Sequence, residues 1–304
     1  MKNRRRLGSP TVLALISVLA LPHFARAQDA DVPYVPTPMN VVDAMLQIAK
    51  VGPQDFVIDL GSGDGRIVIV AARKYGARGL GVELDGALVS DARREAARQG
   101  VAGKVEFRAE NLFITELERA TVLTTYLYPR LNLQLRPRIF EQLKPGTRVV
   151  SHEFDFGNWK PDARVTVPVP EKRYGPPRSD VLMWIVPANA AGTWQWRAQI
   201  EGRELACEVT FQQVFQEIRG SARAAGAPAR IENARLRGTE LAFVLVTSLD
   251  GREVRQELAG RVAGDTIRGS AKLGGTQTQW QAARVKAGRI EIEAAAREAR
   301  VAFN

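Results

Sequence analysis

The ten residues VIDLGSGDGR (57–66) constrain the fold more than any other stretch of this 304-residue chain. A strand-like apolar run leads directly into three glycines, Gly61, Gly63 and Gly65, and a helical pattern begins at Ile67. Glycines at such a junction let the backbone turn tightly and approach a ligand, while the free N–H groups of the following helix face whatever is bound. The stretch therefore predicts a strand–loop–helix unit that holds a small ligand.

The region from Asp55 to about Pro187 alternates short apolar runs with helical periodicity, which predicts an α/β fold with a mostly parallel, Rossmann-like sheet and flanking helices. Residues 130–146 read as a helix that Pro137 kinks or restarts. Two final apolar segments, ARVTVPVP and DVLMWIVP, have the spacing of a closing hairpin. The other expected strands are FVIDL, GLGVEL, KVEFRA, ATVLTTYLY and TRVVSHEF.

The pattern changes after about residue 189, where partly alternating strands are separated by Asp-Gly, Gly-Asp and Gly-Gly turns. We expect the α/β domain to be followed here by a separate all-β domain, a small barrel or sandwich. The predicted organisation is therefore a leader at 1–27, an α/β domain at 28–189 and an accessory all-β domain at 190–304. The strands expected in the last domain are TWQWRAQI, ELACEVTFQQVFQEI, ELAFVLVTSL, REVRQELAGRV, DTIRGSAKL and TQWQAARV.

The first 27 residues have the form of an export signal, with a basic head, an apolar run at 12–21 and the small-x-small sequence Ala25-Arg26-Ala27. The apolar run has about half of the roughly 20 residues that span a bilayer, so an uncleaved anchor is the weaker alternative. The arginines at 4–6 also permit a twin-arginine signal. We therefore expect a periplasmic or cell-envelope protein that is cleaved after Ala27.

Composition limits the chemistry that the mature chain can perform. Five of the ten net positive charges lie in the signal, and the remaining arginines are scattered among glutamates, so no nucleic-acid partner is expected. Cys207 is the only cysteine, and His152 is the only histidine after His23 leaves with the signal. A disulfide within the chain and a zinc site of several cysteines or histidines are thereby excluded, and no metal is expected.

The spacing of the glycine loop separates two kinds of nucleotide ligand. A dinucleotide fingerprint reads G-x-G-x-x-G, and Arg66 stands where its third glycine would be. The spacing G-x-G-x-G, with Asp59 two residues before it and Glu83 ending the next strand, resembles motif one of the class I S-adenosylmethionine-dependent methyltransferases. An acid-rich pocket would repel a pyrophosphate but can accept this phosphate-free, cationic cofactor.

The resemblance implies a set of cofactor-binding residues. In that family the loop passes under the methionine part of the cofactor, and the acid of the second strand, here Glu83, binds the ribose hydroxyls. Asn111 in FRAENLF matches the position where the family usually has an aspartate near the adenine amine, and its carbonyl can still accept that hydrogen bond. Apart from the resemblance, prolines make the segment with Tyr34 and Thr37 extended and stiff, so it could cover the cofactor, or it could be a surface arm that leads to the first helix. The full predicted set is Thr37, Asp59, Gly61, Ser62, Gly63, Gly65, Glu83 and Asn111.

Four further sequence segments are similar to those of a narrower family. They are YVPTPMNVVDAML, DLGSGDGRIVIVAA, TTYLYP and VVSHEFDFGNW. They resemble the mitochondrial lysine methyltransferases that act on the ATP synthase c-subunit and on the adenine nucleotide translocase. The likeness covers about residues 34–187 and does not reach the all-β domain. It implies methyl transfer to a lysine amine of a protein partner, and it allows a membrane-associated substrate.

Two residues are candidates for direct participation in that reaction. Tyr126, at the end of the fourth strand, is the first choice, because an aromatic face and a phenol oxygen can orient an amine. Strand alternation places Tyr128 on the same face, so one of the two could serve packing alone. His152, beside Glu153 and Asp155, could take a proton from the nucleophile, or it could be a core histidine.

Three other functions stay open at this stage. The chain could be an exported scaffold that binds S-adenosylmethionine without turnover, or a methyltransferase for a small-molecule amine. A nicotinamide-dependent dehydrogenase is a weaker alternative, disfavoured by the glycine spacing and the closing hairpin. An exported enzyme also needs a supply of a cytoplasmic cofactor. That supply would require an uncleaved signal facing inward, a misplaced start codon, or export of the loaded protein.

Overall fold

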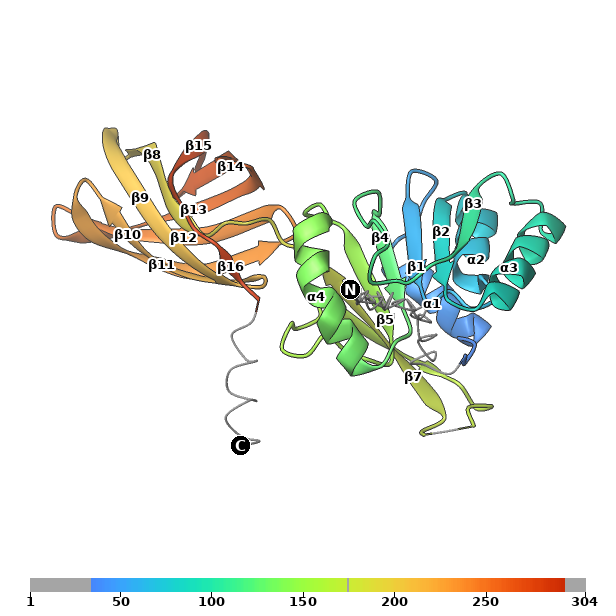
Figure 1. The fold of residues 1–304 in the computed structure, drawn as a ribbon. Helices are drawn as coiled ribbons and strands as arrows, with labels where there is room; N and C mark the ends of the chain where they lie inside the picture. The colour runs from blue at the N-terminus through green and yellow to red at the C-terminus, as the bar shows by residue number, and fades with distance from the viewer. Residues whose placement is uncertain (1–33, 174, 293–304) are drawn as a thin grey trace, which may run out of the picture. The chain divides into compact units, whose positions relative to one another are not determined.

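The computed structural model describes residues 34–173 and 175–292, and its first part is a seven-stranded sheet (Figure 1). The strand order is β3-β2-β1-β4-β5-β7-β6. The first five strands by number are parallel, and β7 and β6 add an antiparallel hairpin at the edge. The bounds are β1 Phe56–Leu60, β2 Arg78–Glu83, β3 Val105–Ala109, β4 Val122–Thr125, β5 Arg148–His152, β6 Ala163–Pro168 and β7 Arg178–Ile185. The Rossmann-like fold and the closing hairpin are thus confirmed.

The order of the strands reverses direction between β1 and β4, and this reversal fixes where a ligand can bind. In open α/β sheets, ligands occupy the crevice at the carboxyl ends of the strands next to such a reversal. The glycine loop follows β1, residues 126–128 follow β4, and Glu153 follows β5, so all three lie at this edge.

Four helices, α1 Met39–Ile48, α2 Arg66–Tyr75, α3 Gly86–Arg98 and α4 Pro129–Gln142, flank the sheet (Figure 1). Alternate residues of each central strand enter different cores: Val57 packs with α1 and α2, whereas Ile58 packs with α4. Helix α4 continues through Pro137, so of the two expected alternatives, a kink or a restart, the restart is wrong. The helix bond lost there would have gone to the carbonyl of Leu133, a residue that is well exposed to water.

The second part of the chain is a closed antiparallel barrel of eight strands. Of the two expected architectures, barrel and sandwich, the barrel is therefore the one observed. Each strand pairs with the next in sequence, β8 pairs with β15 and with β9, and β10 pairs back to β9. Trp196, Phe243 and Trp280 form the aromatic centre of its interior. The bounds are β8 Gly192–Ile200, β9 Arg203–Val214, β10 Glu217–Ala224, β11 Ala227–Arg237, β12 Glu240–Leu249, β13 Arg252–Ala263, β14 Thr266–Leu273 and β15 Thr276–Ala287; a short β16, Ile290–Glu291, pairs with β9.

The single strand expected over 204–218 is wrong, because a turn at Phe215 and Gln216 divides it between β9 and β10. Strand β11 is not predicted by the sequence pattern at all. The predicted signal at 1–27 lies outside the described residues. Within 34–173 and 175–292, none of the helices is long and apolar enough to cross a membrane.

Candidate active site

The glycine loop after β1 has a backbone that only glycine adopts without strain. Gly61, Gly63 and Gly65 have φ values of 77°, 53° and 77°, in the left-handed region that L side chains avoid. The N–H groups of Gly61 and Ser62 donate to the carbonyl of Val82 at 2.8 and 2.9 Å, which fastens the loop to β2. The turn therefore lies at the carboxyl ends of β1 and β2, where the sequence predicts the cofactor.

The space around the loop also demands glycine. A Cβ on Gly63 would stand 2.3 Å from the ring of Tyr34, and one on Gly65 would stand 2.5 Å from the ring of Phe107. Tyr34 precedes α1 in the chain, so the segment before that helix packs directly against the loop. The loop is a cradle of bare backbone with an aromatic wall, which fits a ligand held by close main-chain approach.

Glu83 is positioned at the end of β2 by main-chain donors. Its Oε2 accepts the N–H of Gly63 at 3.0 Å, and its Oε1 accepts those of Leu84 and Asp85 at 2.8 and 3.2 Å. Each carboxylate oxygen has two lone pairs, so Oε2, which accepts only one of these hydrogen bonds, can still bind a hydroxyl. A carboxylate fixed against a glycine loop is an acceptor suited to the hydroxyls of a ribose, and its negative charge suits a cationic ligand.

Asp59 lies in β1, two residues before the loop, and is only 2 % exposed. Its Oδ1 accepts a hydrogen bond from the hydroxyl of Thr124 at 2.7 Å. Burial raises the pKa of Asp59 to about 7, and the nearby carboxylates of Glu83 and Asp64 add to the rise. The carboxyl group two residues before the glycine loop is therefore partly protonated at neutral pH.

The side chains of two predicted cofactor residues, Asn111 and Ser62, lie against neighbouring parts of the protein. The Oδ1 of Asn111 accepts the N–H of Phe113 at 2.9 Å and shapes the turn after β3, although a carbonyl has a second lone pair for an adenine amine. The Ser62 hydroxyl is buried beside Gly81 in β2 and has no hydrogen-bond partner among those residues. Its side chain therefore lies against the sheet, while its backbone remains part of the loop.

The predicted catalytic residues stand at the carboxyl ends of β4 and β5, next to the segment before α1. The ring of Tyr126 lies on that of His152, with centroids 3.9 Å apart and planes inclined by 31°. Thr37 Oγ1 is 3.2 Å from His152 Nδ1, and the carbonyl of Thr37 accepts a hydrogen bond from Arg66 at 2.8 Å. Thr37 thus links the helix that follows the glycine loop to the histidine, and the structure brings Thr37, Tyr126 and His152 together.

Burial decides what His152 can do. The side chain is 1 % exposed, and its Nε2 has no hydrogen-bond partner in the described part of the chain. Burial lowers the pKa of His152 to about 4 against the opposing effect of Glu153, so the ring is neutral at pH 7 and is a weak base. Burial and then the Glu153 carboxylate raise the pKa of Tyr126, which keeps the phenol protonated. These values favour orientation and packing for His152 over proton transfer.

A model of the ANTKMT methyltransferase domain matches residues 59–163. A protein-lysine N-methyltransferase of Saccharolobus islandicus is 44 % identical over 137 residues, which is 45 % of this chain and 85 % of that protein. The chain belongs to the family of the ANTKMT methyltransferase domain. The ATP synthase c-subunit lysine N-methyltransferase of Xenopus laevis is 35 % identical over 153 residues, covering 50 % of this chain and 66 % of that one. A crystal structure of an RNA methyltransferase from Salinibacter ruber with S-adenosyl-L-homocysteine is 52 % identical over 50 % of this chain and 93 % of that one, with a TM-score of 0.45.

The protein is therefore an S-adenosylmethionine-dependent methyltransferase. The match over 59–163 begins at Asp59 and includes the predicted site residues Glu83, Tyr126 and His152. That match ends before the barrel begins at Gly192, and each of the two relatives covers about half of this chain or less.

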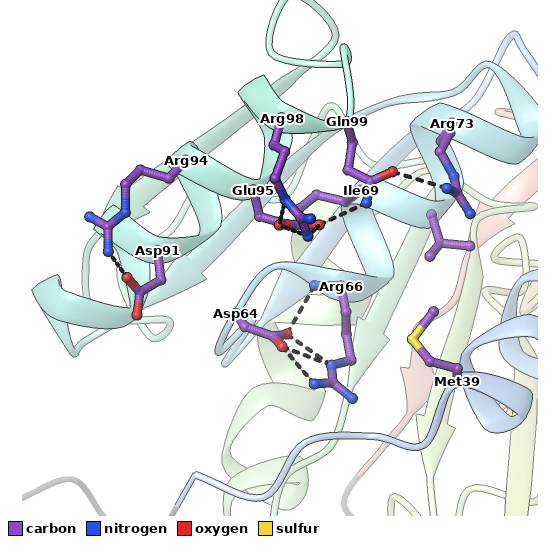
Figure 2. Close-up of a pocket in the computed structure, with 11 residues that line it drawn as sticks. Met39, Asp64, Arg66, Ile69, Arg73, Asp91, Arg94, Glu95, Arg98 and Gln99 are labelled. Carbon is purple, nitrogen blue, oxygen red and sulfur yellow. Dashed lines mark hydrogen bonds and ion pairs between the residues drawn. The ribbon is translucent and has the colours of Figure 1, made fainter.

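A cavity of roughly 670 Å³ in the methyltransferase domain borders the glycine loop through Asp64, a residue of that loop. Figure 2 shows that its walls come mainly from α2 and α3 and carry charged side chains that are already paired. Asp64 and Arg66 are the members nearest the glycine loop, and neither Glu83 nor Tyr126 lines it. The pairs are Arg66–Asp64, Arg94–Asp91 and Arg98–Glu95, and Arg73 donates to Gln99.

The sequence did not identify every residue next to the predicted catalytic residues. Glu153 follows His152 and carries a carboxylate 3.9 Å from its Nε2, and Lys172 from the β6–β7 connection pairs with that carboxylate. The position of Glu153 beside His152 in the sequence was a usable signal. The sequence around Lys172 contains no such signal, because only the antiparallel pairing of β5, β7 and β6 brings Lys172 to Glu153.

Proposed function

We propose that this methyltransferase transfers a methyl group to the ε-amine of a lysine in a protein. The observation that carries the proposal is the match over 59–163, which includes the predicted site residues Glu83, Tyr126 and His152 and joins the chain to relatives named for lysine methylation. The relative from Saccharolobus islandicus is covered over 85 % of its length, so the shared segment is nearly all of that enzyme.

The chemistry needs an aligned, unprotonated amine. When bound, S-adenosylmethionine supplies a methyl group on a sulfonium. The acceptor ammonium must first release a proton to water; the amine nitrogen then forms a bond to carbon as the carbon–sulfur bond breaks, leaving a methylated ammonium and a thioether. The chain contributes alignment and an aromatic face at Tyr126, which stabilises a cationic amine. Glu83 and the glycine loop hold the other reactant.

Exposed apolar side chains around the site support a membrane-associated segment as the substrate. They stand on the segment before α1, on the connections that follow β3 and β4, and, for Leu133, in the N-terminal part of α4. Apolar groups gathered near a site commonly mark a surface for a partner or a membrane. They are Tyr34, Val35, Ile114, Tyr128 and Leu133, each at least 40 % exposed.

The export signal expected at 1–27 supports a site of action in the cell envelope. On this proposal the substrate is an envelope protein, and the twin-arginine form of the signal would deliver the enzyme with its cofactor already bound. Sequencing the mature N-terminus of the protein from fractionated cells tests this part directly. A soluble cytoplasmic protein that begins before residue 27 contradicts it.

The activity is tested with the full-length enzyme and S-adenosylmethionine carrying a labelled methyl group. An envelope extract, lysine peptides, free amines and RNA are offered separately, and mass spectrometry locates the label. Label on lysine of a protein or peptide is expected. Label on RNA or free amines alone overturns lysine as the acceptor, and micromolar cofactor binding without any transfer identifies the chain as a scaffold.

A further inference from the structure

Glu153 occupies a strained turn at the end of β5. Its φ is +67°, and the N–H of Phe154 donates to the carbonyl of His152 at 2.8 Å across it. A hydrogen bond between residues i and i+2 around a positive φ is the pattern of a γ-turn, which is rare for a side chain of this size. The N–H of Glu153 donates to the carbonyl of Asp180 at 2.7 Å and helps to hold the turn. Strain of this kind persists where the surroundings fix it, and it is concentrated at functional sites.

The carboxylate that this turn positions is occupied by an ammonium group of the same chain. Lys172 Nζ donates to Glu153 Oε1, to the carbonyl of Arg178 at 2.7 Å and to the Ser179 hydroxyl at 3.3 Å. The side chains of Lys172 and Glu153 are 17 % and 24 % exposed. Burial alone would raise the pKa of Glu153, but its contacts with Lys172 and Ser179 together hold it below its ordinary value.

This pair adjoins the predicted acceptor residues. Glu153 Oε1 is 3.9 Å from His152 Nε2, and the ring centroid of Tyr126 is 3.9 Å from that of the same histidine. A lysine ammonium, a carboxylate and an aromatic ring therefore already lie together at the carboxyl ends of β4 and β5. These are the groups that a substrate lysine would meet.

We propose that Glu153 is the carboxylate that receives the acceptor lysine and that Lys172 occupies it in the free enzyme. This inference rests on the proposed function. An incoming lysine displaces Lys172, whose ammonium keeps the Arg178 carbonyl and the Ser179 hydroxyl as acceptors. A neutral or anionic group cannot make this exchange, since it would leave a partly buried carboxylate without a counter-charge. The pair thus selects for a cationic acceptor.

Two conservative variants of the full-length enzyme separate the roles. Lys172→Met removes the internal competitor and is expected to lower the KM for a lysine peptide, whereas Glu153→Gln is expected to raise that KM by at least about tenfold. In the double variant the gain from removing Lys172 disappears, because no carboxylate is left to be freed. The cofactor Kd, measured by calorimetry, stays unchanged in all three and shows that the site is folded.

The control is the exposed pair Lys74–Asp43, which joins a lysine and a carboxylate at 2.6 Å between α1 and α2, away from the acceptor side. Lys74→Met and Asp43→Asn leave the KM unchanged. An equal rise of KM in Lys172→Met and Glu153→Gln, or an unchanged KM in both, overturns the inference while wild-type lysine methylation still stands. If the wild type methylates no lysine, the proposed function fails first and the inference fails with it.

Discussion

The ionisation of a single residue, Asp59, is expected to couple cofactor binding to pH. Its pKa is raised to about 7 by burial, so the free enzyme is partly protonated there at neutral pH. A cationic ligand favours the carboxylate, and binding therefore releases a proton below about pH 7. The affinity for S-adenosylmethionine should rise roughly tenfold between pH 6 and 8 and then level off, as expected for one group of pKa about 7.

Calorimetry in buffers of different ionisation enthalpy measures this proton release. Asp59→Asn removes it and flattens the pH profile, whereas Asp43→Asn, an exposed carboxylate on α1, leaves both unchanged. A profile that keeps its slope in Asp59→Asn assigns the proton to another group. The same raised pKa predicts that Asp59 stabilises the cofactor-free fold below about pH 4 and that this contribution is lost as the pH rises through 7.

Individual site residues were predictable where a motif fixes them and not where tertiary pairing does. Asp59 and Glu83 follow from their spacing around the glycines, and the structure places both at the loop. The contact of Tyr126 with His152 joins two strand ends, and the sequence named both residues without predicting that their rings touch. Lys172 reaches Glu153 across 19 residues through the register of a hairpin, which side-chain patterns do not encode.

At the scale of elements, the segment before α1 and the glycine loop form one unit. The ring of Tyr34 fills the space that a side chain at residue 63 would need. Gly63→Ala therefore meets both a φ of +53° and this ring, and we expect cofactor affinity to fall about tenfold or more. Calorimetry with S-adenosylmethionine measures the loss.

Two further variants test the cause of that loss. Tyr34→Ala combined with Gly63→Ala should recover part of the affinity, since the steric conflict is gone and only the backbone strain remains. Gly86→Ala is the matched control, because nothing lies within 4 Å of a Cβ at that position. Equal affinities for Gly63→Ala and the wild type would move the cofactor away from this loop.

The elements of the α/β part were easier to predict than those of the barrel. Strands β1, β2 and β3 are short apolar runs bounded by clear helical patterns, and their positions agree with the sequence to within a residue or so. The β9–β10 turn contains no glycine, and Phe215 adopts a φ of +51° there, so the run appeared continuous. In β11 a register shift between Glu232 and Arg235 breaks the alternation on which strand prediction depends.

At the scale of the whole molecule, stability and cofactor binding should respond to different parts of the chain. The barrel has no free sheet edge among its eight strands, so its interior packing supports all of them together. Trp280 lies in that interior with Trp196 at 5.5 Å and Phe243 at 6.1 Å between ring centroids, and its Nε1 donates to the carbonyl of Ala259. Trp280→Ala should cost about 3–5 kcal/mol of the barrel's unfolding free energy.

The residues predicted to bind the cofactor all lie between positions 37 and 111, outside the barrel. Trp280→Ala should therefore leave the calorimetric Kd for S-adenosylmethionine unchanged under native conditions while denaturant unfolding shifts. Val285→Ala is the control on the same strand, because that side chain is 55 % exposed and its truncation should change neither quantity. If Trp280→Ala weakens cofactor binding together with stability, the barrel is required to form the cofactor site. The methyltransferase domain would then not be the independent unit that its match to shorter relatives implies.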